Sequence, residues 1–301
     1  MRRPPQLFTL NKDAARSLQR ETIEKYLGAK RGKLRYFGLP SSTLGDAKDW
    51  RDLFAEFVAV ERGDSGKEWE LQHELAFQAF RLSLLGSITL LRGDIDAIIK
   101  KGRDSFGKKA VFPFDVVSLD YSGGLFYRST SGELERLKAM DALMARQSEK
   151  QASFVLLISC NLDQVDAGEV RKTIENIRTE LARYGLEAKK VTAAYLNHAR
   201  DEARLKIYVP YFVNQIAAKY HFNCETQEVI FYEGNNKTRM MAFRFYCAFD
   251  PRTESLRPPR ERLNQILNKP LTEIVDGKPR PNSLGLPQLS SPDKEEITDA
   301  K

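Results

Sequence analysis

The sequence of 301 residues has no run of about 20 apolar residues, the length that a membrane-spanning helix needs. It begins with the charged segment MRRPPQLFTLNKDAARSLQRE, which lacks the apolar core of a secretory signal peptide. From these two absences we expect a protein without a membrane segment, located in the cytoplasm. With 42% hydrophobic and 30% charged residues, the chain is suited to one large globular domain or two small ones.

Cysteine and histidine are both scarce. The three cysteines, Cys160, Cys224 and Cys247, are odd in number and far apart, which argues against a disulfide framework and offers no CxxC spacing for zinc. Because there are only three histidines, a metal site built from histidine is not expected either. The sequence therefore predicts no bound metal.

Positive charge is concentrated at the start of the chain. Residues 1–35 contain ten lysines and arginines against three acidic residues, whereas residues 36–250 contain 29 against 30. Clustered cations favour contact with phosphates, because each neutralised phosphate releases a counterion. We therefore predict that residues 1–35 can contact nucleic acid. The alternative is a solvated amphipathic helix over residues 11–28.

The end of the chain differs in composition from the rest. Residues 251–301 hold eight of the thirteen prolines, and only residues 261–267 have a helical pattern. This composition predicts a mostly extended tail that wraps the domain or stays mobile, and that could bind a protein partner. The predicted organisation is a basic helical arm (1–32), a main domain (33–249) and a proline-rich tail (250–301).

Between residues 33 and 249, short apolar runs alternate with segments of helical periodicity. This alternation predicts a mostly parallel sheet with helices on both faces. Two further strands, over 226–232 and 239–249, are separated by Glu233-Gly234-Asn235-Asn236-Lys237, which predicts a C-terminal antiparallel hairpin. The predicted fold is thus an α/β fold with seven strands. The five parallel strands are expected at 34–38, 57–60, 87–91, 114–119 and 154–159.

The ends of the first three strands carry residues suited to a nucleotide. Gly38 ends the first strand, and Glu61 ends the second about 20 residues later, a spacing typical of nucleotide-binding folds in which the acid takes ribose hydroxyls. Asp94, after the third strand, could accept from an adenine amino group. The alternatives are a surface pair of Glu61 with Arg62, and a helix cap at Asp94.

The fourth strand, FDVVSLD, ends on Asp120 and is followed by Tyr121 and two glycines. We expect Asp120 and Tyr121 to lie over the central crevice of the sheet, where Tyr121 could stack on a planar substrate. The alternative is a simple turn at Gly123 and Gly124. Cys160, at the end of the fifth strand, is more typical of a small buried residue than of a nucleophile.

With these residues in view, the chain resembles the class I S-adenosylmethionine-dependent methyltransferase superfamily over residues 33–249. The resemblance rests on the order of elements, the terminal hairpin, Glu61, Gly93-Asp94 and the motif FDVVSLDYSGG. It implies a Rossmann-like fold and S-adenosylmethionine as cofactor. It also implies that Glu61 holds the ribose, Asp94 contacts adenine, and Asp120 with Tyr121 forms the transfer site.

One departure from this family concerns the loop after the first strand, which usually carries an acid and several glycines. Here the loop reads YFGLPSSTLGD, with one early glycine and a proline that removes a backbone donor. Gly38 could still allow close approach of the cofactor, with Ser41 and Ser42 as polar partners. We expect a methyltransferase acting on nucleic acid. The alternatives are a catalytically degenerate binding or scaffold subunit and, third, a small-molecule methyltransferase.

Overall fold

The computed structural model describes residues 10–40, 43–62, 68–121, 123–126, 134–162, 193–194, 197, 200–234, 237–253 and 265–281. Its described strands form one sheet. The strands are β1 (Leu34–Gly38), β2 (Phe54–Glu61), β3 (Ile88–Arg92), β4 (Val116–Asp120), β5 (Phe154–Asn161), β6 (Phe222–Thr226), β7 (Val229–Glu233), β8 (Arg239–Phe249), β9 (Leu271–Val275) and β10 (Lys278–Pro281). The α-helices are α1 (Leu10–Leu27), α2 (Gly45–Trp50), α3 (Glu68–Arg81), α4 (Ile95–Lys101), α5 (Glu135–Ser148) and α8 (Asp201–Lys219), and Gly28–Lys30 forms a short 3-10 helix.

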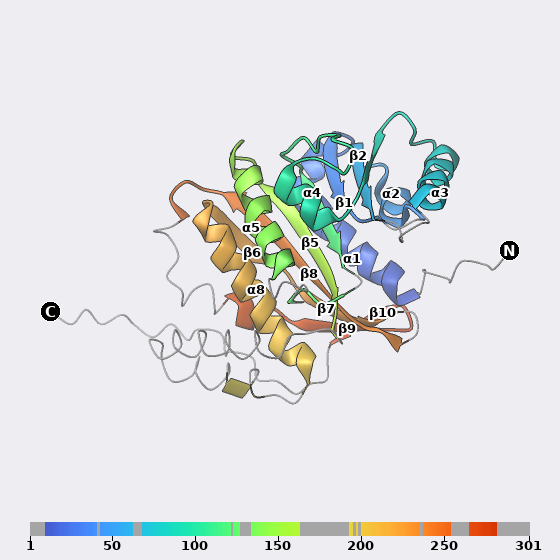
Figure 1. Ribbon diagram of the computed structural model, residues 1–301. Helices are drawn as coiled ribbons and strands as arrows, with labels where there is room; N and C mark the ends of the chain where they lie inside the picture. The colour runs from blue at the N-terminus through green and yellow to red at the C-terminus, as the bar shows by residue number, and fades with distance from the viewer. Residues whose placement is uncertain are drawn as a thin grey trace.

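The strand order of the sheet is β10-β9-β7-β8-β5-β4-β1-β2-β3 (Figure 1). The strands β1 to β5 run parallel to their neighbours, and β8 is antiparallel to both β5 and β7. This arrangement confirms the predicted Rossmann-like α/β fold and its antiparallel hairpin, formed by β7 and β8. The structure adds β6, which pairs with the same edge of β8 as β7 does. Gln227 and Glu228 separate β6 from β7. Between the pairs Thr226–Phe245 and Ile230–Ala242, this side of the ladder has one residue more than β8, as in a β-bulge.

Helices cover both faces of the sheet. Strand residues that alternate along β1, β4 and β5 face two separate cores, as the two-residue repeat of a strand requires. One core packs against α4, α5 and α8, and the other packs against α1, α2 and α3. None of the helices in these described ranges is long and apolar enough to cross a bilayer.

The helix α1 packs against the sheet and is not a solvated helix. It buries Ile23 and Leu27 against the second core. Tyr26 stacks on Tyr246 of β8, with ring centroids 4.3 Å apart. The Arg244 guanidinium donates to the Leu18 carbonyl at 2.6 Å. These contacts connect the basic first segment to strands that lie more than 200 residues later in the sequence.

Part of the proline-rich tail also belongs to the sheet. The strand β9 pairs in parallel with β7, and β10 pairs with β9 at the outer edge of the sheet. The sequence analysis predicted a helix but no strand in this tail. Pro279 and Pro281 lie in β10, at a sheet edge where a missing backbone donor is tolerated. The parts of the tail at 254–264 and 282–301 lie outside the described residues.

The sulfur atoms of Cys224 and Cys247 form a disulfide, so the expectation of no disulfide was wrong for this pair. The two residues are directly opposite each other in the antiparallel pair of β6 and β8, with Cα atoms 4.1 Å apart. Both are fully buried, and Cys160 is the remaining free cysteine. The spacing of the cysteines along the chain could not predict that β6 and β8 pair in the register that places Cys224 opposite Cys247.

Candidate functional site

Three carboxylates line one edge of the sheet. The strands β1 to β4 are parallel, so their carboxyl ends share this edge. Glu61 is the last residue of β2, Asp94 follows β3 by two residues, and Asp120 is the last residue of β4. Such an edge is where open α/β sheets bind ligands. The location predicted for these three acids therefore agrees with the structure, while their roles stay predictions.

Asp120 is held by a lysine from α1. Its Oδ2 atom lies 2.8 Å from Lys12 Nζ, and each of the two side chains is 22% exposed. The ion pair is therefore within reach of solvent at the edge of the sheet. The Lys12 ammonium contacts one oxygen of the carboxylate and leaves the other oxygen available to accept a hydrogen bond.

Asp94 begins the helix α4. Its Oδ1 atom accepts a hydrogen bond from the Ala97 backbone at 3.1 Å, so the side chain is the N-cap that the sequence left open as an alternative. Its Oδ2 atom lies 3.9 Å from the exposed guanidinium of Arg62. A carboxylate has acceptor sites beyond one cap, so the cap and a ligand contact are compatible at Asp94.

Glu61 lies next to the turn that joins β3 to α4. Its side chain is half-buried, and its carbonyl accepts from Gly93 N at 3.2 Å. Gly93 has φ of +134°, a conformation that side chains rarely adopt. The turn therefore keeps the backbone after β3 close to the end of β2, which brings the Glu61 and Asp94 positions together.

Tyr121 does not face the same side of the sheet as Asp120. Successive residues at the end of β4 alternate in direction, so the ring of Tyr121 points into the core beneath α4 and α5 and is only 4% exposed. Its hydroxyl donates to Asp96 Oδ1 at 2.8 Å, and the Arg136 guanidinium lies 4.3 Å from the ring centroid. The predicted stacking of Tyr121 on a substrate is thus contradicted by the burial of its ring.

The carboxyl of Asp96, which accepts the hydrogen bond from Tyr121, has a raised pKa. Asp96 is 7% exposed, and this burial raises the pKa of its carboxyl to about 6, although the Tyr121 hydroxyl works in the opposite direction. Burial also raises the pKa of Tyr121 itself, and the neighbouring Asp96 charge adds to that shift. Tyr121 and Asp96 are therefore a structural hydrogen-bonded pair between β4 and α4.

The space beside Gly38 is filled by the chain itself. A Cβ atom on Gly38 would lie 2.3 Å from the Ser118 carbonyl oxygen and 2.7 Å from the Tyr36 hydroxyl. Tyr36 and Gly38 are two residues apart on one strand and share a face, so the phenol passes over the glycine. The glycine accommodates the protein's own atoms on this face, and its predicted contact with a cofactor stays a prediction. Ser41 lies outside the described residues.

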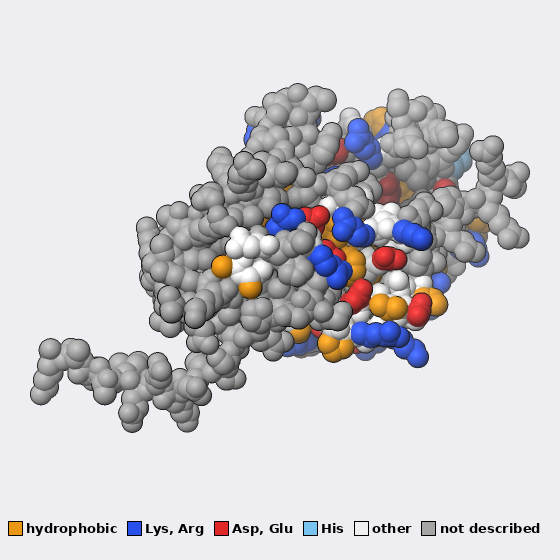
Figure 2. Space-filling model, turned by 90° about the horizontal axis from the view of Figure 1, so that it is seen from below, with side chains coloured by type: hydrophobic (Ala, Val, Ile, Leu, Met, Phe, Trp, Pro, Cys, Tyr) orange, Lys and Arg blue, Asp and Glu red, His pale blue; other side chains and the backbone are white. Residues whose placement is uncertain are grey.

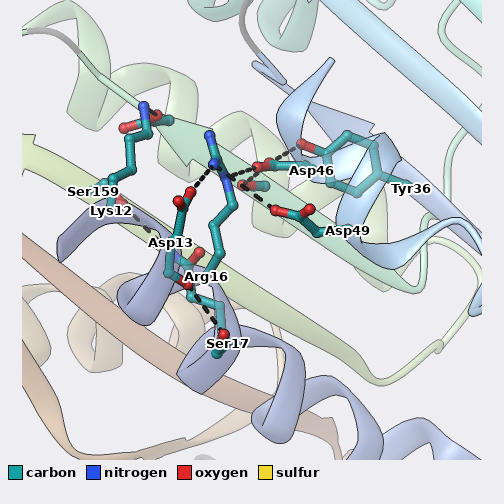
Figure 3. A network of polar contacts seen from close by, with 11 residues as sticks. Lys12, Asp13, Arg16, Ser17, Tyr36, Asp46, Asp49 and Ser159 are labelled. Atoms are coloured by element: carbon teal, nitrogen blue, oxygen red, sulfur yellow. Dashed lines mark hydrogen bonds and ion pairs between the residues drawn. The ribbon is translucent and has the colours of Figure 1, made fainter. Parts of the chain in front are cut away.

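A buried polar cluster lies beneath α1 and was not found by sequence reasoning (Figure 3). The Arg16 Nε atom donates to Asp46 Oδ1 at 3.1 Å, and the Tyr36 hydroxyl donates to Asp46 Oδ2 at 2.7 Å. Ser118 Oγ lies 3.4 Å from the same oxygen. We call Arg16, Tyr36, Asp46 and Ser118 the Arg16 cluster. It joins α1, β1, α2 and β4, which are separate in the sequence.

Nearby acidic residues keep Arg16 protonated despite its burial. Burial alone would lower the pKa of Arg16, but the charges of Asp46 and Asp49 outweigh burial and raise it. Burial, together with the Asp46 charge, raises the pKa of Tyr36 well above its usual value. Gly45 has no side chain because a Cβ there would lie 2.6 Å from the Arg16 guanidinium. The local sequence is therefore shaped around a charged arginine.

A pocket of about 630 Å³ opens beside the Arg16 cluster, between α1 and α2. Its lining residues carry both signs of charge: they are Asp13, Arg16, Ser17, Arg20, Lys48, Asp49 and Trp50. Burial raises the pKa of Asp49, although the nearby Arg16 opposes this shift. The mixture of charges does not favour a polyanion such as a nucleic-acid backbone in this pocket.

The cations of the basic first segment are largely engaged within the protein. In the described part of this segment, ion pairs to acidic side chains are made by Lys12, Arg16, Arg20, Lys25, Lys30, Arg31 and Arg35. Figure 2 shows lysine and arginine side chains next to aspartate and glutamate on the face seen from below. A cation that is already paired contributes less to phosphate binding, because its partner must first be displaced.

Cys160 is a buried thiol. It is 2% exposed, and burial raises its pKa to about 12. A thiol with this pKa carries almost no thiolate at neutral pH, and the thiolate is the nucleophile. The structure therefore favours the small buried residue over the nucleophile that the sequence left open.

No protein-family model matches the chain, and no curated protein sequence matches it. Among solved structures, it is similar to precorrin-6y C5,15-methyltransferase from Geobacter metallireducens, with 11% identity, 82% of this chain and 93% of that chain covered, and a TM-score of 0.41. An rRNA methylase from Streptococcus thermophilus has 8% identity, coverages of 77% and 96%, and a TM-score of 0.42. An N-methyltransferase from Bradyrhizobium japonicum has 8% identity, coverages of 78% and 97%, and a TM-score of 0.40.

These similarities concern the fold alone. The strand order and the antiparallel β8 are those of a mostly parallel, Rossmann-like α/β fold. A fold of this kind serves many substrates, so the activity has to be argued from the residues of the site.

Proposed function

We propose that the protein is an S-adenosylmethionine-dependent methyltransferase that acts on nucleic acid. The observation that carries the proposal is the row of three carboxylates, Glu61, Asp94 and Asp120, at the shared carboxyl edge of β2, β3 and β4. Ribose hydroxyls and amino groups are donors, so a nucleoside cofactor and an amine acceptor both suit such a row. The fold supports the same proposal.

The residues at the edge fit the nucleoside part of the cofactor. Glu61 is half-buried and can accept from two ribose hydroxyls, and Asp94 retains acceptor capacity after capping α4. The fit is poorer beside Gly38, where Tyr36 fills the space. We therefore assign only the nucleoside contacts to residues of this chain.

The cofactor, when bound, would supply an electrophilic methyl group. Asp120 would orient the acceptor and take its proton, since its carboxylate is partly exposed at the edge. Lys12 would hold the Asp120 carboxylate in position for the acceptor. Tyr121 has no direct part in this scheme, because its hydroxyl is engaged by Asp96 in the core.

Nucleic acid is the acceptor class that the charge of the chain favours. The formal net charge is +7 and the sequence pI is about 9.2. A net positive charge raises the rate and affinity of encounter with polyanions. Because the cations of α1 are paired internally, we do not assign the contact to that helix.

The test is a calorimetric titration of S-adenosylmethionine and S-adenosylhomocysteine into the wild type and Glu61→Ala. Loss of hydrogen bonds to a charged acceptor should weaken binding by about 10- to 150-fold. The matched control is Glu56→Gln, in the same strand but paired with Arg35 at 2.7 Å, which should bind as the wild type does. Equal affinity in Glu61→Ala and the wild type would refute the assigned site.

A second candidate function is a non-catalytic binding subunit with a methyltransferase fold. It is favoured by one observation, the filling of the space beside Gly38 by Tyr36 and Ser118. This candidate predicts that the folded wild type binds neither S-adenosylmethionine nor S-adenosylhomocysteine. The same titration therefore separates the two functions.

A further inference from the structure

A small, tightly built loop projects beside the end of β3. A backbone bridge between Arg103 and Lys109 closes it. Inside the loop, Asp104 is buried, and its carboxylate accepts from three backbone N–H groups at 2.8 to 3.1 Å, those of Arg92, Phe106 and Lys108. We call residues 102–110 the Phe106 loop. Its conformation is held from within, so it can present side chains with little loss of freedom on binding.

The loop presents an aromatic ring to solvent. Phe106 is 74% exposed, and the Arg92 guanidinium lies 5.1 Å from its ring centroid. A large apolar ring in this position costs free energy in water unless another molecule covers it. An open aromatic face next to a guanidinium is a surface on which a nucleobase can stack.

Cations surround this ring. Lys101, Arg103, Lys108 and Lys109 are all exposed. None of the four forms an ion pair with a residue in the described ranges of the structure. The acid within the loop, Asp104, is buried and bonded to the backbone. Lys108 Nζ donates to the Leu90 carbonyl at 3.5 Å, but, unlike the cations of α1, none of the four has to leave an acidic partner in the described ranges to contact a phosphate.

The Phe106 loop lies beside the row of carboxylates. Ser105 donates to the carbonyl of Arg92 through its backbone at 3.1 Å and through its hydroxyl at 2.9 Å. Arg92 is the last residue of β3 and pairs with Glu61 of β2. A polymer that stacks a base on Phe106 can therefore extend along the edge toward the other strand ends.

We infer that the Phe106 loop is a binding surface for single-stranded nucleic acid, with a base stacked on Phe106 and phosphates bound by the surrounding cations. This inference rests on the proposed function, and it names the surface that holds the acceptor strand. Single strands fit better than duplexes, because only an unpaired base offers its face to a protruding ring.

Exposed aromatic residues also occur on α3, and they supply a control. Phe80 is 66% exposed, in a helix whose sequence EWELQHELAFQAFR carries three acidic residues. Phe80 thus matches Phe106 in residue type and exposure but not in its charged surroundings. If exposure alone produced binding, both residues would contribute equally.

The experiment measures fluorescence anisotropy of a labelled 20-nucleotide single strand, as RNA and as DNA, with the full-length protein at 50 to 200 mM salt. Phe106→Ala should weaken binding about 5- to 150-fold, the range found for one stacked base. Phe106→Trp should restore it. Lys108→Ala combined with Lys109→Ala should flatten the salt dependence by about 1.4 in logarithmic slope. Phe80→Ala should behave as the wild type does.

Calorimetry with S-adenosylmethionine separates this inference from the proposed function. Phe106→Ala is expected to keep the cofactor affinity and the melting temperature of the wild type. Weaker cofactor binding with unchanged oligonucleotide binding would overturn the inference, and so would equal oligonucleotide binding by Phe106→Ala and Phe80→Ala. Oligonucleotide binding that depends on Phe106, in a protein that binds no cofactor, would support the surface and refute the methyltransferase.

Discussion

Replacing Arg16 by methionine tests whether the Arg16 cluster stabilises the fold. Methionine keeps much of the volume of the side chain but removes the guanidinium. Asp46, which is 7% exposed, would then keep the Tyr36 hydroxyl as its one close partner within the cluster. A buried carboxylate that loses its cation is expected to destabilise the protein strongly.

The expected loss of unfolding free energy is about 3 to 5 kcal/mol, the usual effect of breaking a buried ion pair on one side. The assay is equilibrium unfolding in urea at pH 7, followed by circular dichroism. Lys25→Met is the control on the same helix. The Lys25 side chain is 58% exposed and lies 4.0 Å from Glu225, so its removal should change stability by less than about 1 kcal/mol.

The double variant Arg16→Met with Asp46→Asn completes a thermodynamic cycle. Because asparagine removes the buried charge and can still accept from Tyr36, the double variant should be more stable than Arg16→Met alone. If Arg16→Met lost no more stability than Lys25→Met, the reasoning about this buried pair would be refuted.

Two further predictions concern groups in the core. Burial raises the pKa of Asp96 from 3.8 to about 6, so the folded chain holds this proton more tightly than the unfolded chain. The wild type should therefore lose about 3 kcal/mol of stability relative to Asp96→Asn as the pH rises from about 3 to about 7; parallel urea titrations of the two would contradict this. The disulfide closes a loop with a sequence separation of 23. Its reduction should lower the free energy of unfolding by about 3 kcal/mol, and thiol titration of the unfolded, non-reduced chain should detect Cys160 alone.

The sequence was a good guide to the parallel strands and to the residues at their ends. The apolar runs that became β2 and β4 stop at a carboxylate, so the ends of these strands at Glu61 and Asp120 could be located. The sequence could not decide whether Asp94 caps a helix or contacts a ligand, because a carboxylate that follows a strand can serve in either role.

Features that depend on distant pairing could not be predicted. Arg16 and Asp46 are 30 residues apart, and nothing in their local patterns links them. Tyr121 follows the last residue of β4. The face of the sheet toward which its side chain points therefore depended on whether the alternation of side chains along the strand continued past Asp120. The strand β10 contains two prolines, which favour a loop unless the strand lies at a sheet edge. Cys224 and Cys247 meet only through the register of β6 on β8.

The docking of α1 has a consequence for the order in which the chain folds during synthesis. Asn11 of this helix donates to the Glu233 carbonyl and accepts from the Gly277 backbone, 222 and 266 residues later. At about 5 to 20 residues per second, the ribosome needs roughly 10 to 50 s to make this second partner. An isolated helix of this length is only marginally stable in water. The helix α1 is therefore made long before the strands against which it docks, and it can complete these contacts only after they have been synthesised.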